Sequence, residues 1–358
     1  ASAHHICRPI AHAHVAPALS RMRLSAFVTQ QVWPRRSGVA CLLWPLSLVT
    51  GCWIRANRWL YQQGWRQVTR LPVPVVVVGN VVAGGTGKTP VVISLVEHFE
   101  SQGWQVGVIA RAYGSPSESV KEVSRHSSSA DAGDEPLLVK RRCNVPVFVG
   151  RERSQAALAL RKAYPNTDLI LSDDGMQHHA LWHDIALCVF DDRGPGNGWL
   201  LPAGPLREPW PTAPALGVVR HVLYTGKQHP DGAWAAQRSL ATFARNGAGE
   251  QRNLSEWAGQ PVQALAAIAK PDAFFQSLAQ AGLQLEKCWP LPDHADLSQW
   301  QTDSPLPIFC TEKDAVKLWP HQPQAWAVAL DCKLPANLLD ALALNLQQLS
   351  LIHGQKTA

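Results

Sequence analysis

The sequence predicts an α/β protein in which a doubly wound parallel sheet is joined to a smaller C-terminal α/β subdomain and preceded by an N-terminal membrane-associated helix. Short apolar runs alternate with amphipathic stretches along most of the chain, as in strands connected by helices. A glycine-rich loop, residues 79–90, lies between the first of these strands and the helix after it. A chain of 358 residues exceeds one ordinary core, so one large or two moderate domains are expected.

The N-terminal region combines a His- and Ala-rich start with a long uncharged stretch. Residues 1–21 have no apolar period and no secretory core, so we expect a disordered leader, with Met22 as the candidate true start. Residues 37–54 carry no charge, contain Trp44 and Trp53, and are flanked by arginines. As a helix they would extend ~27 Å, slightly less than a hydrocarbon core of ~30 Å. This favours a helix in the interface of an anionic leaflet, with a single span and a buried helix as alternatives.

The glycine-rich loop predicts a site for the phosphates of a nucleotide. It follows the buried strand expected at 75–78 and leads into an apolar-faced helix at 91–96. In such a loop, backbone N–H groups hold the β-phosphate, Lys88 reaches the β- and γ-oxygens, and Thr89 offers its hydroxyl to Mg²⁺. Val82 stands where the usual spacing has glycine, and the loop is relaxed by two later glycines. The predicted nucleotide-binding residues are Gly84, Gly85, Thr86, Gly87, Lys88 and Thr89. The fold expected is therefore P-loop NTPase-like.

The remaining elements follow from the alternation of apolar and polar residues. In the same domain we expect strands at 105–110, 145–149, 168–174 and 185–190, helices at 135–142 and 151–163, and an exposed loop at 113–133. Residues 193–216 are rich in Gly and Pro, which excludes a long helix or central strand and leaves a rigid active-site rim or a linker. The smaller unit is expected to contain strands at 262–268, 307–310 and 326–331 and helices at 271–282, 313–319 and 336–349.

Three carboxylates in the first domain could carry chemistry. Asp173 and Asp174 follow a buried strand, where an acid can hold Mg²⁺ directly or through water. The alternative for this pair is an N-cap aspartate. Asp134 begins a short helix after the exposed loop, so helix capping is its default role by residue preference. The functional alternative for Asp134 is a general base that meets a substrate hydroxyl.

The smaller unit has two further polar segments. Asp293 and His294 form an acid–imidazole pair in a loop, an arrangement that is usually incidental but can be catalytic. The segment 311–314, Thr-Glu-Lys-Asp, closes an apolar strand and opens a helix. It is similar to the guanine-reading motif of GTPases, but its Lys and Asp are adjacent. A capping box explains Thr311 and Asp314 equally well.

The composition limits the kinds of molecule that this protein is expected to bind. A net charge of +6 and a pI near 9.0 suit a partner that carries phosphate, such as a nucleotide, a nucleic acid or an anionic membrane. The arginines are spread thinly along the chain, so no nucleic-acid partner is expected. The eight cysteines show no C-x-x-C pairing and several lie in apolar runs, which favours buried thiols in a reducing compartment over a zinc or disulfide framework.

Several short motifs occur in order along the chain. They are Trp44-Pro45-Leu46-Ser47, Pro72-Val73-Pro74, Val78-Gly79-Asn80, the loop 84–90, Gly133-Asp134-Glu135-Pro136, the segment 173–178, the segment 201–208, Asp293-His294 and the segment 311–315. In this order they resemble the tetraacyldisaccharide 4′-kinase family, the lipid A 4′-kinases of Gram-negative bacteria, from about Met22 to near the C-terminus. The loop of that family likewise lacks the first glycine. Ala295 departs from the family, which often has a bulkier polar residue there.

The resemblance implies a membrane-associated, ATP- and Mg²⁺-dependent kinase of lipid A biosynthesis at the cytoplasmic face of the bacterial inner membrane. It would transfer the γ-phosphate of ATP to the 4′-hydroxyl of a tetraacyl glucosamine disaccharide 1-phosphate. Its partners would be this lipid A precursor and the inner-membrane lipid surface, with no obligate protein partner. The expected domains are the leader 1–21, a membrane-associated helical segment 22–70, the P-loop kinase domain 71–222 and the C-terminal subdomain 223–350.

The resemblance also implies roles for single residues. Triphosphate and Mg²⁺ would be held by Lys88, Thr89, Asp173 and Asp174. Asp134 would be the catalytic base that accepts the proton of the sugar hydroxyl, paired with His294. Either Arg151 or Arg153 would neutralise phosphate charge.

Two other functions fit parts of the sequence. A P-loop switch or metal-insertion chaperone would use hydrolysis to drive a conformational change, and the His-rich leader suits it superficially. A soluble ATP-dependent ligase or small-molecule kinase would bury residues 37–54 in its core. GTP preference or stoichiometric metal binding would favour the first of these, and unfolding on deletion of 22–60 would favour the second.

Overall fold

The computed structural model describes residues 28–111 and 119–356, which pack as two compact units. The larger unit takes in the chain as far as Gln237 and again from Cys332 onward, and the smaller unit takes in 238–331. The predicted leader and part of the predicted loop 113–133 lie outside the described residues. The expected domain boundary between 222 and 223 lies within one strand of the larger unit, and the compact units divide after Gln237.

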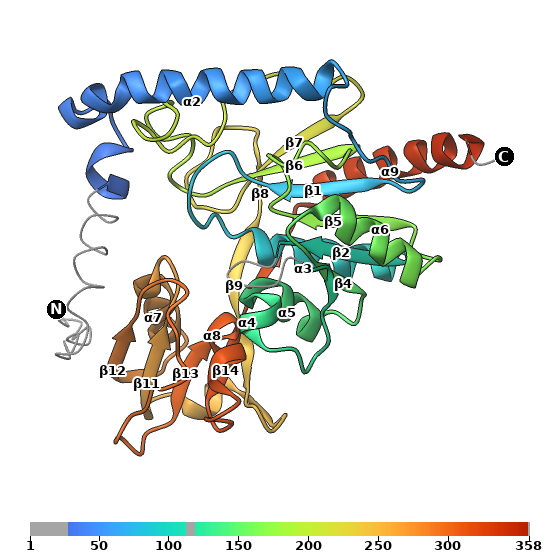
Figure 1. Cartoon of the computed structure of the whole chain (residues 1–358). Coiled ribbons are helices and arrows are strands. Elements are labelled where there is room, and N and C mark those ends of the chain that lie inside the picture. Colours follow the sequence, from blue (N-terminus) through green and yellow to red (C-terminus); the bar gives the residue numbers. More distant parts are fainter. Residues whose placement is uncertain (1–27, 112–118, 357–358) are drawn as a thin grey trace. The chain divides into compact units, whose positions relative to one another are not determined.

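The larger unit is built on an eight-stranded sheet with the order β3-β4-β2-β5-β1-β6-β7-β8. Its strands are parallel except for β3, which runs antiparallel to β4. The strands are β1 (Val75–Gly79), β2 (Val106–Ala110), β3 (Lys121–Glu122), β4 (Val147–Val149), β5 (Leu169–Asp173), β6 (Ile185–Phe190), β7 (Val219–Tyr224) and β8 (Trp234–Ala235). Every residue of β1, β2, β4, β5 and β6 is buried, as expected of central strands covered on both faces. The predicted doubly wound parallel sheet is confirmed (Figure 1).

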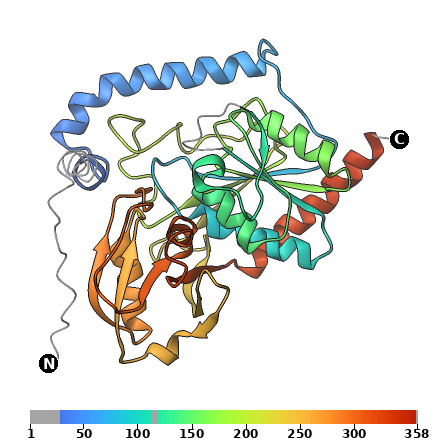
Figure 2. The same ribbon diagram turned by 60° about the horizontal axis from the view of Figure 1, so that its bottom comes forward.

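Helices cover this sheet (Figure 2). They are α3 (Lys88–Ser101), α4 (Ser129–Ala132), α5 (Asp134–Arg142), α6 (Arg153–Ala163) and α9 (Ala336–Lys356), and a short π-helix η1 (Val28–Val32) lies near the N-terminal end. Helix α9 belongs to the larger unit, where Asn345 contacts His221 of β7 at 2.9 Å. The sequence expectation placed this helix in the C-terminal subdomain. The chain re-enters the larger unit at Cys332, near the end of β14, and α9 follows within that unit.

Helix α2 (Gly38–Gln62) presents most of its apolar side chains to solvent. It runs eight residues beyond the predicted end at 54, and Pro45 lies inside without ending it. Among the described residues it is the one helix long and apolar enough to cross a membrane. Its exposed large apolar residues are Val39, Leu42, Trp44, Leu46, Leu48, Val49, Trp53 and Trp59. The alternative of a buried core helix over 37–54 is therefore wrong.

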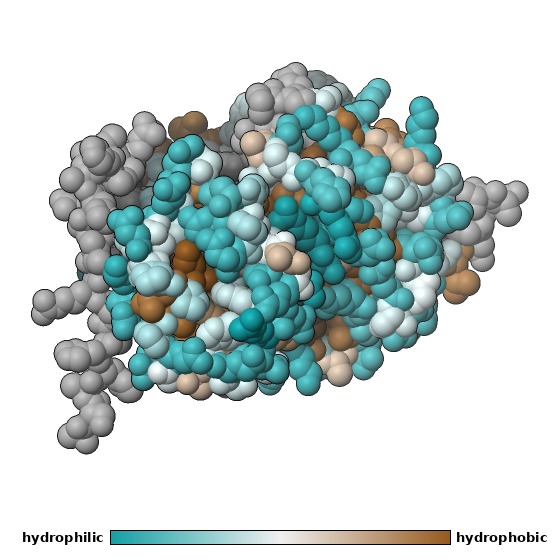
Figure 3. All heavy atoms as spheres, turned by 90° about the horizontal axis from the view of Figure 1, so that it is seen from below, coloured by the Kyte–Doolittle hydropathy of each residue, from teal (hydrophilic) through white to brown (hydrophobic). Residues whose placement is uncertain are grey.

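One narrow stripe of α2 packs against the larger unit. Its buried residues are Ala40, Ser47 and Gly51, whose spacings of seven and four place them on one helical face. Leu42, Val49 and Trp53 repeat the same spacing on the opposite face, where they are 81%, 67% and 68% exposed. By contrast, the molecular face shown in Figure 3 is mostly hydrophilic, with apolar residues in small separate areas. The apolar face of α2 is therefore a feature that needs a partner.

The smaller unit contains a six-stranded sheet with the order β10-β9-β14-β13-β11-β12. Its elements are β9 (Gln237–Arg245), β10 (Gln251–Asn253), the 3₁₀ turn η2 (Leu254–Trp257), β11 (Pro261–Ala266), α7 (Pro271–Gln280), β12 (Gln284–Pro290), β13 (Ile308–Thr311), α8 (Glu312–Leu318) and β14 (Trp326–Lys333). The predicted strands at 262–268, 307–310 and 326–331 correspond to β11, β13 and β14. A core around Phe274, Phe309 and Trp257 holds the sheet to α7.

Five of the seven described cysteines are buried, as expected. Cys41 and Cys52 are exposed because both lie on α2. Cys7 lies outside the described residues.

Two partly buried histidines that follow β5 give the fold an acid-sensitive element. Burial lowers the pKa of His179 and of His183 to about 4 in each case. An unfolded histidine titrates near 6.5, so between these values the unfolded chain binds more protons than the folded one. The stability that these neutral rings contribute is present above pH 6.5 and is lost as the pH falls toward 4.

We therefore expect the double variant His179→Gln, His183→Gln to be less acid-sensitive than the natural protein. Between about pH 7 and pH 5 its free energy of unfolding should fall by on the order of 2 kcal/mol less than that of the natural protein. Denaturant titrations at the two pH values measure this difference. The exposed His126→Gln is the matched control and should leave the pH dependence unchanged. An unchanged pH dependence in the double variant would contradict the prediction.

Candidate active site

The phosphate loop leaves the centre of the larger sheet next to the strand that ends in acids. Strand β1 lies between β5 and β6, and Val78 stands beside Asp173 in the parallel register. The Asp174 N–H also donates to the Val78 carbonyl at 2.8 Å. Because the carboxyl ends of parallel strands share one edge, the loop and both acids meet there, at the usual ligand position of an open α/β sheet.

Helix α3 begins at Lys88 with an N-terminus open to an anion. Gly87 is its N-cap and adopts a left-handed conformation (φ 77°), which favours glycine. No described side chain caps this end, and the first turn carries no acid. The first N–H groups of a 14-residue helix are thus available for phosphate.

Lys88 and Arg207 converge on one carboxylate. The Lys88 ammonium lies 3.4 Å from Asp174 Oδ1, and Arg207 Nη1 donates to both Asp174 oxygens at 3.0 and 3.1 Å. Burial acts to raise the pKa of Asp174, but Lys88 and Arg207 outweigh it and hold the pKa below its ordinary value. Asp174 also has a positive φ of 53°, uncommon for a residue other than glycine. Three charges therefore meet beside the phosphate loop.

Asp173 is buried and, unlike Asp174, has a carboxylate oxygen, Oδ1, without a hydrogen-bond partner among the described residues. Burial raises the pKa of Asp173 to about 7, although Lys88 acts in the opposite direction. Arg153 is buried beneath the pair and donates to the backbone carbonyls of Asp173 (3.1 Å) and Asp174 (2.8 Å). Arg153 thus fixes the acid-bearing turn, while Arg151 is exposed.

Residues 205–207 of the Gly/Pro-rich segment 193–216 pair with the phosphate loop, as a rim of the site would, and this pairing explains Val82. Val82 is buried and pairs with Leu206 in an antiparallel bridge. Ala83 N donates to the Pro205 carbonyl at 2.8 Å, and Arg207 N donates to the Val81 carbonyl at 2.7 Å. The first half of the phosphate loop is therefore strand-like, a conformation in which a β-branched residue is preferred to glycine. The same pairing brings Arg207 to Asp174.

Two further polar residues, Gln177 and Glu208, join this site, and sequence reasoning assigned neither of them a role. Gln177 donates to the Asn80 carbonyl at 3.0 Å and to Glu208 at 2.7 Å. Glu208 is buried and lies 3.6 Å from Arg58 of α2. The one sequence signal for these residues is that they lie in the motifs 173–178 and 201–208. Their contacts could not be predicted, because they join segments that are far apart in sequence.

Asp134 is the first residue of α5 and is buried. Gly133, not Asp134, occupies the N-cap position, so the default capping role for Asp134 is wrong. Burial is the main cause that raises the pKa of Asp173, and the negative charge of the next residue, Glu135, acts in the same direction.

His294 belongs to the smaller unit. It has a positive φ of 61°, and its Nε2 atom lies 3.2 Å from Lys313 Nζ. Lys313 also donates to Asp293 at 3.0 Å. An ammonium can only donate, so the imidazole accepts at Nε2 and carries its proton on Nδ1. The pairing of His294 with Asp134 stays a prediction, because the two residues lie in different units.

The segment 311–314 caps a helix. Thr311 is the N-cap of α8 and its hydroxyl accepts from Asp314 N at 3.2 Å. Asp314 Oδ2 accepts from Ala267 N at 3.1 Å, which ties α8 to the end of β11. The capping alternative is confirmed for Thr311.

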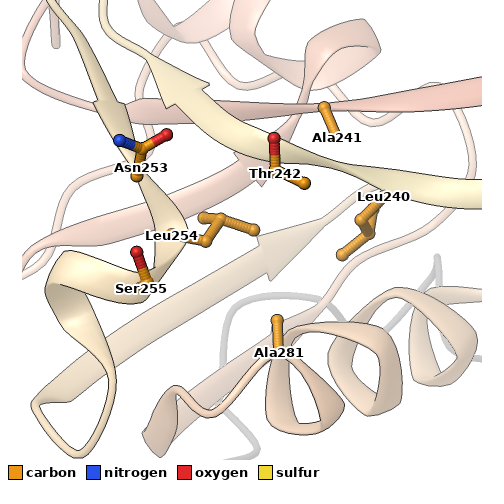
Figure 4. Close-up of a pocket in the computed structure, with 7 residues that line it drawn as sticks. All are labelled: Leu240, Ala241, Thr242, Asn253, Leu254, Ser255 and Ala281. Atoms are coloured by element: carbon orange, nitrogen blue, oxygen red, sulfur yellow. The ribbon is translucent and has the colours of Figure 1, made fainter.

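A separate pocket of about 360 Å³ lies in the smaller unit and is lined by Leu240, Ala241, Thr242, Asn253, Leu254, Ser255 and Ala281 (Figure 4). It contains no ionisable side chain, and Asn253 is engaged as the cap of η2. The pocket therefore lacks the groups that phosphoryl transfer requires.

Comparison with known proteins agrees with this geometry. A family model described as Tetraacyldisaccharide-1-P 4'-kinase matches residues 39–347. The chain is 50% identical over 322 residues to the tetraacyldisaccharide 4'-kinase of Acidovorax ebreus, covering 89% of this chain and 94% of the relative. It is 46% identical to the enzyme of the same name from Delftia acidovorans, covering 88% of this chain and 94% of that one.

A solved structure shares the fold. LpxK from Aquifex aeolicus, in complex with ATP, has a TM-score of 0.73 and 25% sequence identity, covering 86% of this chain and 99% of the other. The match of the family model to most of the chain, with relatives near half identity, decides the assignment. The chain belongs to the tetraacyldisaccharide-1-P 4'-kinase family.

Proposed function

We propose that this protein transfers the γ-phosphate of ATP to the 4′-hydroxyl of a tetraacyl glucosamine disaccharide 1-phosphate, a lipid A precursor. The observation that carries the proposal is the meeting of the phosphate loop, Lys88 and the two acids at one sheet edge in a chain of this family. Catalysis of phosphoryl transfer depends mainly on positioning and charge neutralisation, which this edge supplies. The related LpxK from Aquifex aeolicus, solved with ATP, supports the choice of nucleotide.

The acids fit a magnesium ion. Asp173 Oδ1 is buried without a partner among the described residues, and oxygen ligands are the ones that Mg²⁺ prefers. We propose that Thr89, Asp173 and Asp174 hold it together with oxygens of the nucleotide. Mg²⁺ bound there would neutralise charge that develops on the phosphates. The described residues contain no group of three or more His, Cys, Asp or Glu side chains suited to a metal. Mg²⁺ sites typically use one or two carboxylates and substrate phosphates, so this agrees with the proposal.

We propose that Asp134 is the catalytic base and that His294 assists it. The Asp134 carboxylate takes the proton of the 4′-hydroxyl as that oxygen attacks the γ-phosphorus, and the bond from phosphorus to the bridging oxygen of ADP breaks. Lys88 leaves Asp174 for the triphosphate, where its charge stabilises the transferring group. Arg207 remains with Asp174, so the acid keeps a counter-ion during this exchange.

We infer that α2 lies along a membrane surface instead of crossing the bilayer. Ser47, near the middle of the helix, donates to the Leu200 carbonyl at 2.8 Å and accepts from Ala203 N at 3.0 Å. A spanning orientation would draw this polar loop into the hydrocarbon, where each unsatisfied backbone group costs several kcal/mol. Pro45 also leaves the Cys41 carbonyl without its intrahelical donor, which water or a headgroup can supply. ATP is cytoplasmic, so we place this surface on the cytoplasmic face of the inner membrane.

We expect the double variant Leu42→Glu, Val49→Glu to bind vesicles containing phosphatidylglycerol at least tenfold more weakly than the natural protein, since each buried Leu or Val contributes roughly 1.5–3 kcal/mol. Co-sedimentation at fixed salt measures this. The matched control is Leu216→Glu, Leu344→Glu, which alters exposed leucines outside α2. Equal loss of binding in both variants would show that added charge, and not the α2 face, is responsible.

The activity is tested by phosphate transfer from γ-labelled ATP to the disaccharide 1-phosphate in detergent, beside a water-soluble sugar. We expect the lipid alone to be labelled. Labelling of the soluble sugar at a comparable rate would favour a small-molecule kinase. Hydrolysis of the nucleotide without an acceptor, together with a preference for GTP, would favour a switch protein.

A further inference from the structure

The phosphate loop has an outer side on which its carbonyls are bound. Four consecutive backbone oxygens each accept a hydrogen bond from a side chain. The contacts are Arg193 Nη1 to Ala83 O (3.4 Å), Asn80 Nδ2 to Gly84 O (3.2 Å), Arg193 Nη2 to Gly85 O (2.8 Å) and Thr225 Oγ1 to Thr86 O (2.8 Å). The donors come from three separate segments of the larger unit. Local chain geometry alone therefore does not produce this pattern.

Such contacts matter because a loop that binds phosphate must present N–H groups inward. A carbonyl that turned inward would place partial negative charge against the triphosphate. Donors on the outer side oppose that rotation, since each carbonyl would lose its partner. The loop is thus held in an anion-binding conformation before the nucleotide arrives, which reduces the ordering cost of binding.

Arg193 is the central donor, because one guanidinium binds two loop carbonyls and is itself fixed. Its Nε lies 2.9 and 3.0 Å from the two carboxylate oxygens of Asp191, which is buried just after β6. The guanidinium lies against Gly84, where an added Cβ would be 3.2 Å from Nη1. Gly84 also has a φ of +94°, a conformation that favours glycine.

Thr225, the residue directly after β7, adds a further donor to the same arrangement. Its buried hydroxyl lies 2.8 Å from Thr86 O and 3.2 Å from the Phe190 carbonyl. Asn80 Nδ2 also contacts Thr86 Oγ1 at 3.2 Å, so the fourth residue of the group is held at both its carbonyl and its hydroxyl. Strands β6 and β7 thereby supply a fixed frame for a loop that leaves β1.

We propose that Arg193, anchored by Asp191, and Thr225 are positioning residues that hold the phosphate loop in its nucleotide-binding conformation. The inference rests on the proposed use of ATP. It assigns to the segment after β6 a role in nucleotide affinity in addition to its place in the active-site rim. An arginine is needed at 193, because a lysine ammonium cannot bind two carbonyls and a carboxylate in the geometry of a planar fork.

The test separates affinity from turnover. We expect Arg193→Met to raise the KM for ATP at least tenfold while kcat changes less than about threefold, and Arg193→Lys to recover only part of the affinity. Arg238→Met, at an exposed arginine of the smaller unit, is the control and should leave both constants unchanged. Binding of a non-hydrolysable ATP analogue is measured in parallel, so loop positioning can be judged even if the acceptor proves to be wrong.

A second pair of variants guards against a folding defect in Arg193→Met. Thr225→Val keeps the shape of the side chain and removes its donor, whereas Thr225→Ser keeps the hydroxyl. We expect Val to weaken binding of the ATP analogue at least threefold and Ser to retain near-natural affinity, at similar thermal midpoints. The proposal is overturned if Val and Ser behave alike, or if Arg193→Met binds the analogue as tightly as the natural protein.

Discussion

Replacing Lys88 by alanine is expected to lower the rate of phosphate transfer by on the order of 10³ or more. In the structure the Lys88 ammonium lies 3.4 Å from Asp174, at the start of α3 and next to the phosphate loop. The Lys88 ammonium can exchange Asp174 for the triphosphate. Removing this ammonium therefore removes a positive charge that stabilises the transferring phosphoryl group. Single-turnover transfer from γ-labelled ATP measures the effect.

Two controls make the Lys88 result specific. Lys227→Ala removes an exposed lysine of the same unit and should leave the rate unchanged. Thermal unfolding of Lys88→Ala without nucleotide should remain cooperative, because Asp174 keeps Arg207 as its partner at 3.0 Å. Retention of more than a tenth of the natural rate in Lys88→Ala would refute the assignment of Lys88 to the triphosphate.

The second large effect is expected at Asp134. Asp134→Asn should lower kcat by about 10²–10⁴ while ATP affinity stays within about twofold of the natural value. The amide has the same shape but cannot take a proton from the acceptor hydroxyl. Asp134 is buried at the first position of α5, and because Gly133 supplies the N-cap, the substitution leaves the helix start intact.

The matched control is Asp131→Asn in α4, three residues away, where the carboxylate is exposed and pairs with Lys121. This variant should keep natural turnover. If Asp134→Asn retained near-normal turnover, Asp134 would not be the base. A parallel loss of ATP binding would instead assign Asp134 to the nucleotide side of the site.

The central sheet could be predicted because its strands are uniform. Strands β1 and β6 are continuous apolar runs buried on both faces, β5 begins with three apolar residues, and Gly87-Lys88 marks the start of α3. The short and edge strands escaped prediction for the opposite reason. In β7 buried residues alternate with partly buried ones, in β12 most residues are exposed or partly buried, and in β9 most residues are exposed, so the apolar signal in each is weak.

Site residues that belong to a local sequence motif were predicted. Site residues that reach the site only through tertiary contacts were missed. Lys88 and the two acids carry a motif signal, and the register of β1 with β5 brings them together. Arg207 and Arg193 act on residues more than thirty and a hundred positions away, respectively, so spacing could not assign them. The length of α2 was underestimated because the uncharged stretch ends at Ile54, before Arg55, whereas the helix continues to Gln62.

The bridge between Val82 and Leu206 has a consequence for how this enzyme can be recombined. The phosphate loop and the segment 193–208 share backbone hydrogen bonds at Ala83 and Arg207. Ser47 of α2 in turn donates a hydrogen bond to the Leu200 carbonyl of that segment. A chimera that imports residues 80–89 from a glycine-containing P-loop protein would leave Leu206 without its strand partner. Residues 80–89 and 193–208 therefore form one exchangeable module. The two segments should be transplanted together. In related proteins, a substitution at the position of Val82 should be accompanied by a substitution at the position of Leu206.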